Sequence, residues 1–136
     1  MDLKPLFSPK TIAVIGVSRS NDRHPANVIY SKLRLRYAVK VYPVNPKGGE
    51  IHRETIYRDV AEIPDKIDLA VIAARAEFVP AILLRCAKAN VGGVTIISGG
   101  FAEVGRTDLQ QRLVDITGET DLPFIGPNCL GIYVPR

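Results

Sequence analysis

The sequence alternates repeatedly between short apolar runs and helical segments, and this pattern limits the folds it can adopt. Each run is rich in β-branched residues and leads through a loop toward a segment whose apolar residues recur at helical spacing. This alternation is typical of a parallel sheet flanked by helices, and strands that are apolar nearly throughout are expected where both faces are covered. We therefore predict an α/β fold: one Rossmann-like domain over residues 1–136, with a doubly wound parallel sheet of about five strands. The predicted strands are residues 11–15, 39–44, 69–73, 94–97 and 124–125.

Three helices are expected between these strands. The first begins near Pro25, whose fixed φ suits a first helical turn, and the second covers about residues 77–90. The third is predicted to start with a capping box of Thr107 and Gln110 and to end at Gly118. The long segment 46–64 is expected to hold a short strand at 55–57 and a helical turn at 59–63. The residues expected to face the core are Ala26, Ile29 or Tyr30, Leu33 and Tyr37 in the first helix, Phe78, Val79, Ile82, Leu83, Cys86 and Ala87 in the second, and Leu109, Leu113 and Ile116 in the third.

Composition excludes several other classes of protein. Hydrophobic residues make up 46% and charged residues 24% of the chain, which is typical of a soluble globular domain. No apolar run approaches the ~18 residues of a membrane span and no secretory signal is recognisable, so we expect a cytoplasmic protein without membrane contact. The net charge of +4 comes without aromatic interleaving or a long basic run, so nucleic-acid binding is not expected. Histidines and cysteines lack metal-ligand spacing, so no metal site is predicted.

The first strand exit, GVSRSNDRHPAN, suits an anion. In an open parallel α/β sheet, ligands bind beyond the carboxyl ends of the strands. Gly16 permits a tight turn, and the loop can direct backbone N–H groups, the Ser18 and Ser20 hydroxyls and the following helix dipole at one phosphate. The alternative is a plain strand-to-helix connection in which Asn21 or Asp22 caps the helix.

The second strand exit, VYPVNPKGG, argues against NAD. A classical NAD site places an acidic residue about 20–30 positions after the glycine turn, where it binds the ribose hydroxyls. This sequence has Asn45, Pro46 and Lys47 at that place. A lysine there suits an extra phosphate on the ribose, as in NADP or coenzyme A; the alternative is that Lys47 is a solvated loop residue beside Gly48 and Gly49.

The remaining exits carry weaker signals. The third presents small Ala73 and Ala74 followed by Arg75, which leaves room for a flat ring or simply packs the start of a helix. The fourth, ISGGFAEVG, is a second glycine loop that can approach a ligand closely. In the fifth, IGPNCLGIYVP, Cys129 has no basic neighbour in sequence to lower its pKa, so a structural or ligand-contacting role is favoured over a nucleophile.

Taken together, LFSPKTIAVIGVS, VYPVNPKGGEI, IPDKIDLAVIA, ISGGFAEVG and GPNCLGI resemble the amino-terminal coenzyme A-binding domain of NDP-forming acyl-CoA synthetases, the ADP-forming acetyl-CoA synthetase family. The succinyl-CoA synthetase α subunit is a more distant relative. The resemblance covers essentially the whole chain and implies that it binds coenzyme A or acyl-CoA, with Asn128 and Cys129 near the thiol end. The strand exits and the resemblance together predict these ligand-binding residues: Gly16, Val17, Ser18, Arg19, Ser20, Asn21, Asn45, Pro46, Lys47, Ala74, Arg75, Ile97, Ser98, Gly99, Asn128 and Cys129.

The resemblance also implies that the chain has no turnover of its own. In these synthetases the phosphorylated histidine and the ATP-grasp domain lie beyond the coenzyme A domain, so we expect further synthetase domains or subunits as partners and no catalytic residue here. Two departures stand out: Pro25 and Ala26 replace a glycine where the first helix opens, which predicts a phosphate farther from the backbone, and Arg75 replaces a proline. The alternatives are a regulatory coenzyme A-binding module, including the front of a protein acetyltransferase, and an NADP-binding reductase domain, against which the GPNCLG loop argues.

Overall fold

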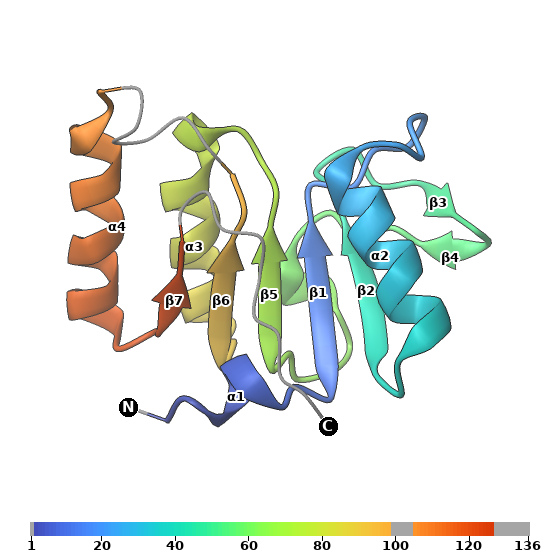
Figure 1. Cartoon of the computed structure of the whole chain (residues 1–136), viewed down its shortest axis with the longest axis horizontal. Helices are drawn as coiled ribbons and strands as arrows, with labels where there is room; N and C mark the ends of the chain where they lie inside the picture. The colour runs from blue at the N-terminus through green and yellow to red at the C-terminus, as the bar shows by residue number, and fades with distance from the viewer. Residues whose placement is uncertain (1, 99–104, 127–136) are drawn as a thin grey trace.

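The computed structural model describes residues 2–98 and 105–126, and its centre is a five-stranded parallel sheet (Figure 1). The strand order is β2-β1-β5-β6-β7, so the chain starts in the interior of the sheet and extends it in both directions. The predicted α/β class and all five predicted strands are confirmed, each with ends within one residue of the expected ones. The strands are β1 (Thr11–Ile15), β2 (Lys40–Val44), β5 (Leu69–Ile72), β6 (Gly93–Ile96) and β7 (Phe124–Ile125).

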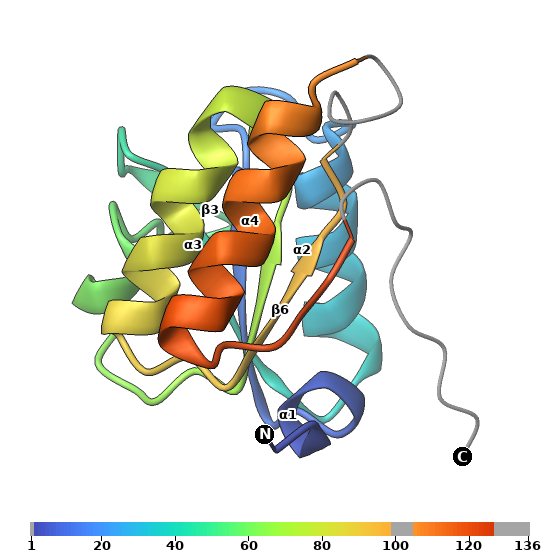
Figure 2. The same ribbon diagram turned by 90° about the vertical axis from the view of Figure 1, so that its left-hand side faces the viewer.

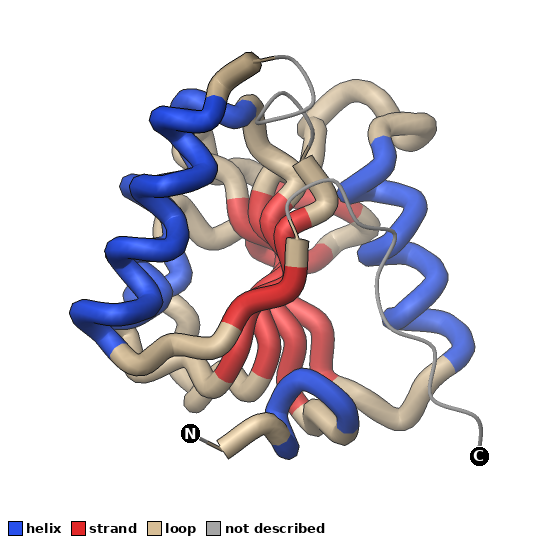
Figure 3. The backbone as a smooth tube through the Cα atoms, turned by 60° about the vertical axis from the view of Figure 1, so that its left-hand side comes forward, coloured by secondary structure: helices blue, strands red, loops and turns tan. Residues whose placement is uncertain are grey.

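Helices cover both faces of the sheet, as a doubly wound fold requires (Figure 2). Helix α2 (Pro25–Arg36) lies on one face, and α3 (Val79–Lys88) and α4 (Thr107–Thr120) lie on the other. The strands alternate between these layers: Ile12 and Val14 pack with α2, whereas Ala13 and Ile15 pack with α3 and α4. The short helix α1 (Lys4–Phe7) packs near the amino end of β6, and Figure 3 shows the strands enclosed between the helical layers.

The segment between β2 and β5 forms a small substructure beside the sheet. Strands β3 (Glu50–Ile51) and β4 (Glu54–Thr55) make a two-stranded antiparallel ribbon. The predicted helical turn is confirmed as the 3-10 helix η1 (Val60–Glu62). The short strand expected at 55–57 is replaced by β4 and by a single parallel bridge between Val44 and Tyr57. This bridge holds the returning chain against the exit of β2.

Several expected details of the helices are wrong. Phe78 lies in the 3-10 helix η2 (Ala76–Phe78), ahead of α3, and is 55% exposed rather than in the core. Tyr37 follows the end of α2 in extended conformation and is 51% exposed.

The ends of α4 also differ from expectation, and the difference is local. Thr107 is the first residue of α4 instead of its cap, and the N-cap position is held by Arg106, whose side chain makes no capping bond. Gly118 stays helical, and the helix ends only at Asp121, which takes the left-handed conformation and donates its N–H to the Thr117 carbonyl. A glycine ends a helix where its backbone turns left-handed. Gly118 keeps helical conformation, so it lowers the stability of α4 without ending the helix.

The strand order determines where a ligand can bind. The connection from β1 leads through α2 to β2 at one edge, and the chain then returns past β1 to β5 on its other side. This reversal at β1 is a topological switch point, where the loops leaving neighbouring strands diverge and leave a crevice at the carboxyl edge.

Candidate functional site

The turn that leaves β1 depends on Gly16. Its φ is +112°, and a Cβ placed there would lie 2.9 Å from the Ala73 carbonyl oxygen. Its N–H donates to the Val44 carbonyl at 2.9 Å. Gly16 therefore joins the ends of β1, β2 and β5, and the tight turn predicted there is confirmed.

The loop after Gly16 is closed by a buried side chain of α2. Asn27 is 1% exposed; its Oδ1 accepts from the Ser18 N–H at 2.6 Å and its Nδ2 donates to the Ser18 carbonyl at 2.8 Å. One amide thus satisfies both backbone groups of Ser18. Asn27 is not among the residues predicted from the sequence, although a polar residue between Ala26 and Tyr30 on the inward face of the helix is a usable signal.

The rest of the loop also uses its own donors. The Ser18 hydroxyl accepts from the N–H groups of Ser20 and Asn21 at 3.2 and 3.0 Å. The Asn21 side chain accepts from the Arg23 N–H at 3.0 Å. Helix α2 is capped by His24, whose Nδ1 accepts from the Ala26 N–H, so the alternative of Asn21 or Asp22 as the cap is wrong. Several of the loop N–H groups that were expected to bind a phosphate are therefore already bonded within the protein.

The loop that follows β2 is hydrogen-bonded to the loop that follows β1. Asn45 donates from Nδ2 to the Val17 carbonyl at 2.6 Å, and its Oδ1 accepts from the Lys47 N–H at 2.8 Å. Gly49 follows with φ +101°, and a Cβ there would lie 3.0 Å from Nε of Arg19. The glycine therefore leaves room for the Arg19 side chain to lie against the β2–β3 loop.

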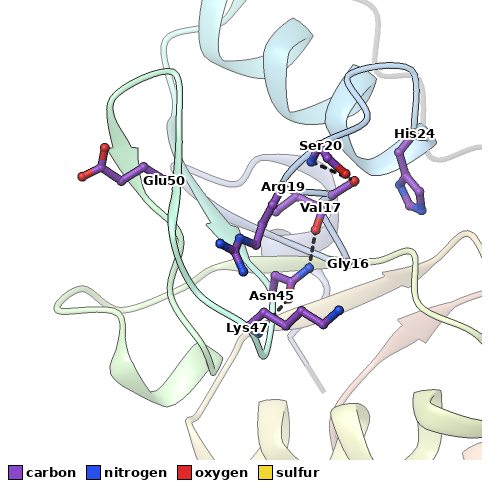
Figure 4. Close-up of a pocket in the computed structure, with 9 residues that line it drawn as sticks. Gly16, Val17, Arg19, Ser20, His24, Asn45, Lys47 and Glu50 are labelled. Carbon is purple, nitrogen blue, oxygen red and sulfur yellow. Dashed lines mark hydrogen bonds between the residues drawn. The ribbon is translucent and has the colours of Figure 1, made fainter.

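These two loops border an open pocket of about 610 Å³ at the carboxyl ends of β1 and β2 (Figure 4). Its size is within the usual range for a small-molecule site. Among the described residues neither Arg19 nor Lys47 forms an ion pair, while Glu50 points away from both in the figure. The pocket therefore presents two uncompensated cations to an anion. The lining residues are Gly16, Val17, Ser18, Arg19, Ser20, His24, Asn45, Lys47 and Glu50.

The pocket brings together seven of the predicted residues and adds His24 and Glu50, which the sequence analysis did not select. The other predicted residues lie outside the lining. Arg75 is exposed and forms a salt bridge with Glu77 at 3.3 Å. Ser98 is buried, and its hydroxyl donates a hydrogen bond to the Ile72 carbonyl. Asn21 lies in the adjoining turn and Pro46 is exposed, whereas Ala74 and Ile97 are half-buried against the core. Gly99, Asn128 and Cys129 lie outside the described residues.

Other kinds of site are not found in the described part of the chain. No group of histidine, cysteine and acidic side chains there could hold a metal ion, and no helix is long and apolar enough to cross a membrane. Cys86 is fully buried in the core as predicted, and burial raises the pKa of its thiol to about 12, with the Asp59 carboxylate adding to the shift. A thiol in this setting is unreactive near neutral pH.

Comparisons with known proteins identify the domain. Residues 10–135 match the family described as CoA binding domain. The chain is 39% identical over 142 residues to the acetate–CoA ligase [ADP-forming] I subunit alpha of Pyrococcus furiosus, covering 99% of this chain and 31% of that subunit. It is 39% identical over 131 residues to the acetate–CoA ligase [ADP-forming] of Methanocaldococcus jannaschii, covering 96% of this chain and 18% of that protein.

A solved structure agrees with these sequence relatives. The dinucleotide forming acetyl-coenzyme A synthetase 1 of Ca. Korarchaeum cryptofilum superimposes with a TM-score of 0.87 at 34% identity, over 96% of this chain and 28% of that one. The chain thus spans less than a third of the length of these relatives. The resemblance predicted from the strand exits is confirmed: this chain belongs to the CoA-binding domain family, and ADP-forming acetate–CoA ligases are among its relatives.

Proposed function

We propose that this chain supplies the coenzyme A site of an ADP-forming acyl-CoA synthetase and does not turn over substrate by itself. The observation that supports this most directly is the pair of unpaired cations, Arg19 and Lys47, in a pocket at the switch point of a CoA-binding domain. The relatives that carry this domain as part of a longer protein or as an alpha subunit support the synthetase context. Further domains or subunits would then provide the nucleotide-binding and phosphoryl-transfer steps.

The loops suggest how the ligand lies. The turn after Gly16 would face the diphosphate, with Arg19 and Ser20 as side-chain donors beside it. Lys47 leaves the neighbouring strand, where the ribose of a nucleotide extends in doubly wound folds. We therefore assign the 3′-phosphate of coenzyme A to Lys47.

The same geometry disfavours NAD. The place of the ribose-binding carboxylate is taken by Asn45, and both ends of its amide are already bonded to Val17 and Lys47 backbone groups. An NADP-binding domain remains the second candidate because Lys47 could also meet a 2′-phosphate. A regulatory coenzyme A module would share the pocket but not the synthetase context.

Calorimetric titration of the chain with coenzyme A, NADP and NAD at one ionic strength tests the ligand. We expect coenzyme A to bind at least about tenfold more tightly than either dinucleotide, which corresponds to ~1.4 kcal/mol. Equal or tighter binding of NADP would contradict the proposal.

Turnover is tested by incubating the chain with acetyl-CoA, ADP and phosphate. No ATP should form. Phosphorylation of His24 or His52 that follows turnover would show that the chain acts as an enzyme alone. A regulatory module is distinguished by adding the remaining domains of a related synthetase: a synthetase part should restore ATP formation, whereas a regulatory module should bind coenzyme A without restoring it.

A further inference from the structure

Two of the first backbone positions of α2 have no N–H group free to bind an anion in the pocket. Pro25 occupies the first helical position and has no N–H, and the N–H of Ala26 donates to Nδ1 of His24 at 3.2 Å. The first N–H groups of a helix are normally the ones that bind phosphate. A diphosphate placed here therefore needs donors from side chains.

The capping bond also fixes the tautomer of His24. Because Nδ1 accepts a hydrogen bond, it carries no proton, and the neutral imidazole must carry its proton on Nε2. No hydrogen bond from Nε2 is formed within the described residues, and the partly buried ring lines the pocket. Figure 4 places His24 on the opposite side of the turn from Glu50, so no carboxylate of the pocket lining competes for this N–H.

We propose that His24 has two roles, one for each ring nitrogen: Nδ1 caps α2, and Nε2–H donates to the diphosphate of coenzyme A. In this way one side chain replaces the backbone donors that Pro25 and the cap remove. This inference rests on the proposed coenzyme A site. It makes His24 a ligand-binding residue for the diphosphate in addition to the cap of α2.

Two substitutions separate the roles, because Asn and Gln each match one ring nitrogen. His24→Asn places a carbonyl near Nδ1 and keeps the cap, but its amide is too short to reach where Nε2 donates. His24→Gln extends an amide N–H₂ to the position of Nε2, but it is a poor helix cap. The two variants are therefore expected to show opposite patterns in stability and in affinity.

The ligand for the test is dephospho-coenzyme A, which keeps the diphosphate and lacks the 3′-phosphate assigned to Lys47. By calorimetry, His24→Asn should weaken its binding about tenfold, since a hydrogen bond to a charged group is lost, while its urea midpoint stays near that of the wild type. His24→Gln should bind within about threefold of the wild type and unfold at lower urea.

An independent measurement is nitrogen NMR of the imidazole, with His52 as the reference histidine. The free protein should show His24 with its proton on Nε2, and dephospho-coenzyme A should shift that nitrogen. A proton on Nδ1 in the free protein, or wild-type affinity in His24→Asn, overturns the role of His24. A wild type that binds neither coenzyme A nor its dephospho form overturns the proposed function itself, so the two failures are distinct.

Discussion

Substituting Asn27 by alanine should damage both the fold and the pocket, because Asn27 is the internal partner of the first loop. The change deletes the bonds at 2.6 and 2.8 Å that satisfy the N–H and carbonyl of Ser18. Each such bond contributes about 0.5–1.5 kcal/mol, and a buried group left without a partner costs about 1–3 kcal/mol. Ser18 is only half-buried, so water can satisfy part of the loss. We therefore expect the free energy of unfolding to fall by about 2–4 kcal/mol.

The same change should loosen the pocket. Residues 18–20 line it and are positioned through Ser18, so we expect coenzyme A to bind about tenfold more weakly in folded Asn27→Ala protein. Urea unfolding followed by circular dichroism gives the stability, and calorimetry below the unfolding transition gives the affinity.

Asn21→Ala is the matched control. Asn21 lies in the same loop, and its side chain accepts one exposed hydrogen bond from the Arg23 N–H at 3.0 Å, so loss of this bond should cost less than about 1 kcal/mol. If Asn27→Ala is no less stable than Asn21→Ala, the loop does not depend on the buried amide of Asn27.

Four further substitutions test the strand exits, helix α4 and the core. Lys47→Ala should weaken coenzyme A binding roughly 5- to 100-fold and dephospho-coenzyme A much less, measured as a calorimetric double-mutant cycle; equal losses would exclude Lys47 as the 3′-phosphate partner. Gly16→Ala should destabilise the fold by more than about 3 kcal/mol in urea unfolding, since φ is +112° and the Ala73 carbonyl is in the way, whereas Gly118→Ala in open helix should stabilise it by up to ~1 kcal/mol. In a Cys129→Ser background, which should keep coenzyme A affinity within about tenfold, Cys86 should not react with a thiol reagent at pH 8 because its pKa is raised to about 12. Fast labelling of the native protein would show that α3 opens.

The strands were predictable because their signal is strong and local. Each is a short β-branched run, and every one of them was confirmed to within a residue. The helix ends were not predictable to the same degree. Thr107 and Gly118 have the right chemistry for a cap and a stop, but whether a residue takes that role depends on backbone conformation, which neighbouring packing decides.

The site was predictable where residue types are unusual. Gly16 and the NPKGG loop have glycines with positive φ in the structure, and both loops line the pocket. Asn27 and His24 were not predicted as site residues, because their hydrogen bonds to Ser18 and Ala26 depend on the folded conformation of the loop. A sequence pattern typical of a helix does not indicate such bonds. The predicted ligand-binding residues include the exits of β5 and β6, because all the parallel strands end at the same edge of the sheet. Adjacent strands lie about 4.8 Å apart, so the exit of β6 is roughly 10 Å from that of β1, beyond the pocket described here.

The hydrogen bonds within the two loops explain why side-chain charge contributes more than backbone N–H groups to anion binding in this pocket. The bonds of Gly16 to Val44, of Asn27 to Ser18 and of Asn45 to Val17 join the two loops into one frame before any ligand is present. These bonds and the cap of α2 use the N–H groups of Gly16, Ser18 and Ala26, so fewer backbone donors are left for an anion. Among the residues that the structure describes, the charged ends of Arg19 and Lys47 have no ion pair and Nε2 of His24 has no hydrogen bond. The cationic side chains of Arg19 and Lys47 are therefore separate from Asn27 and Asn45, which join the loops, while His24 is proposed to serve both the helix cap and the ligand.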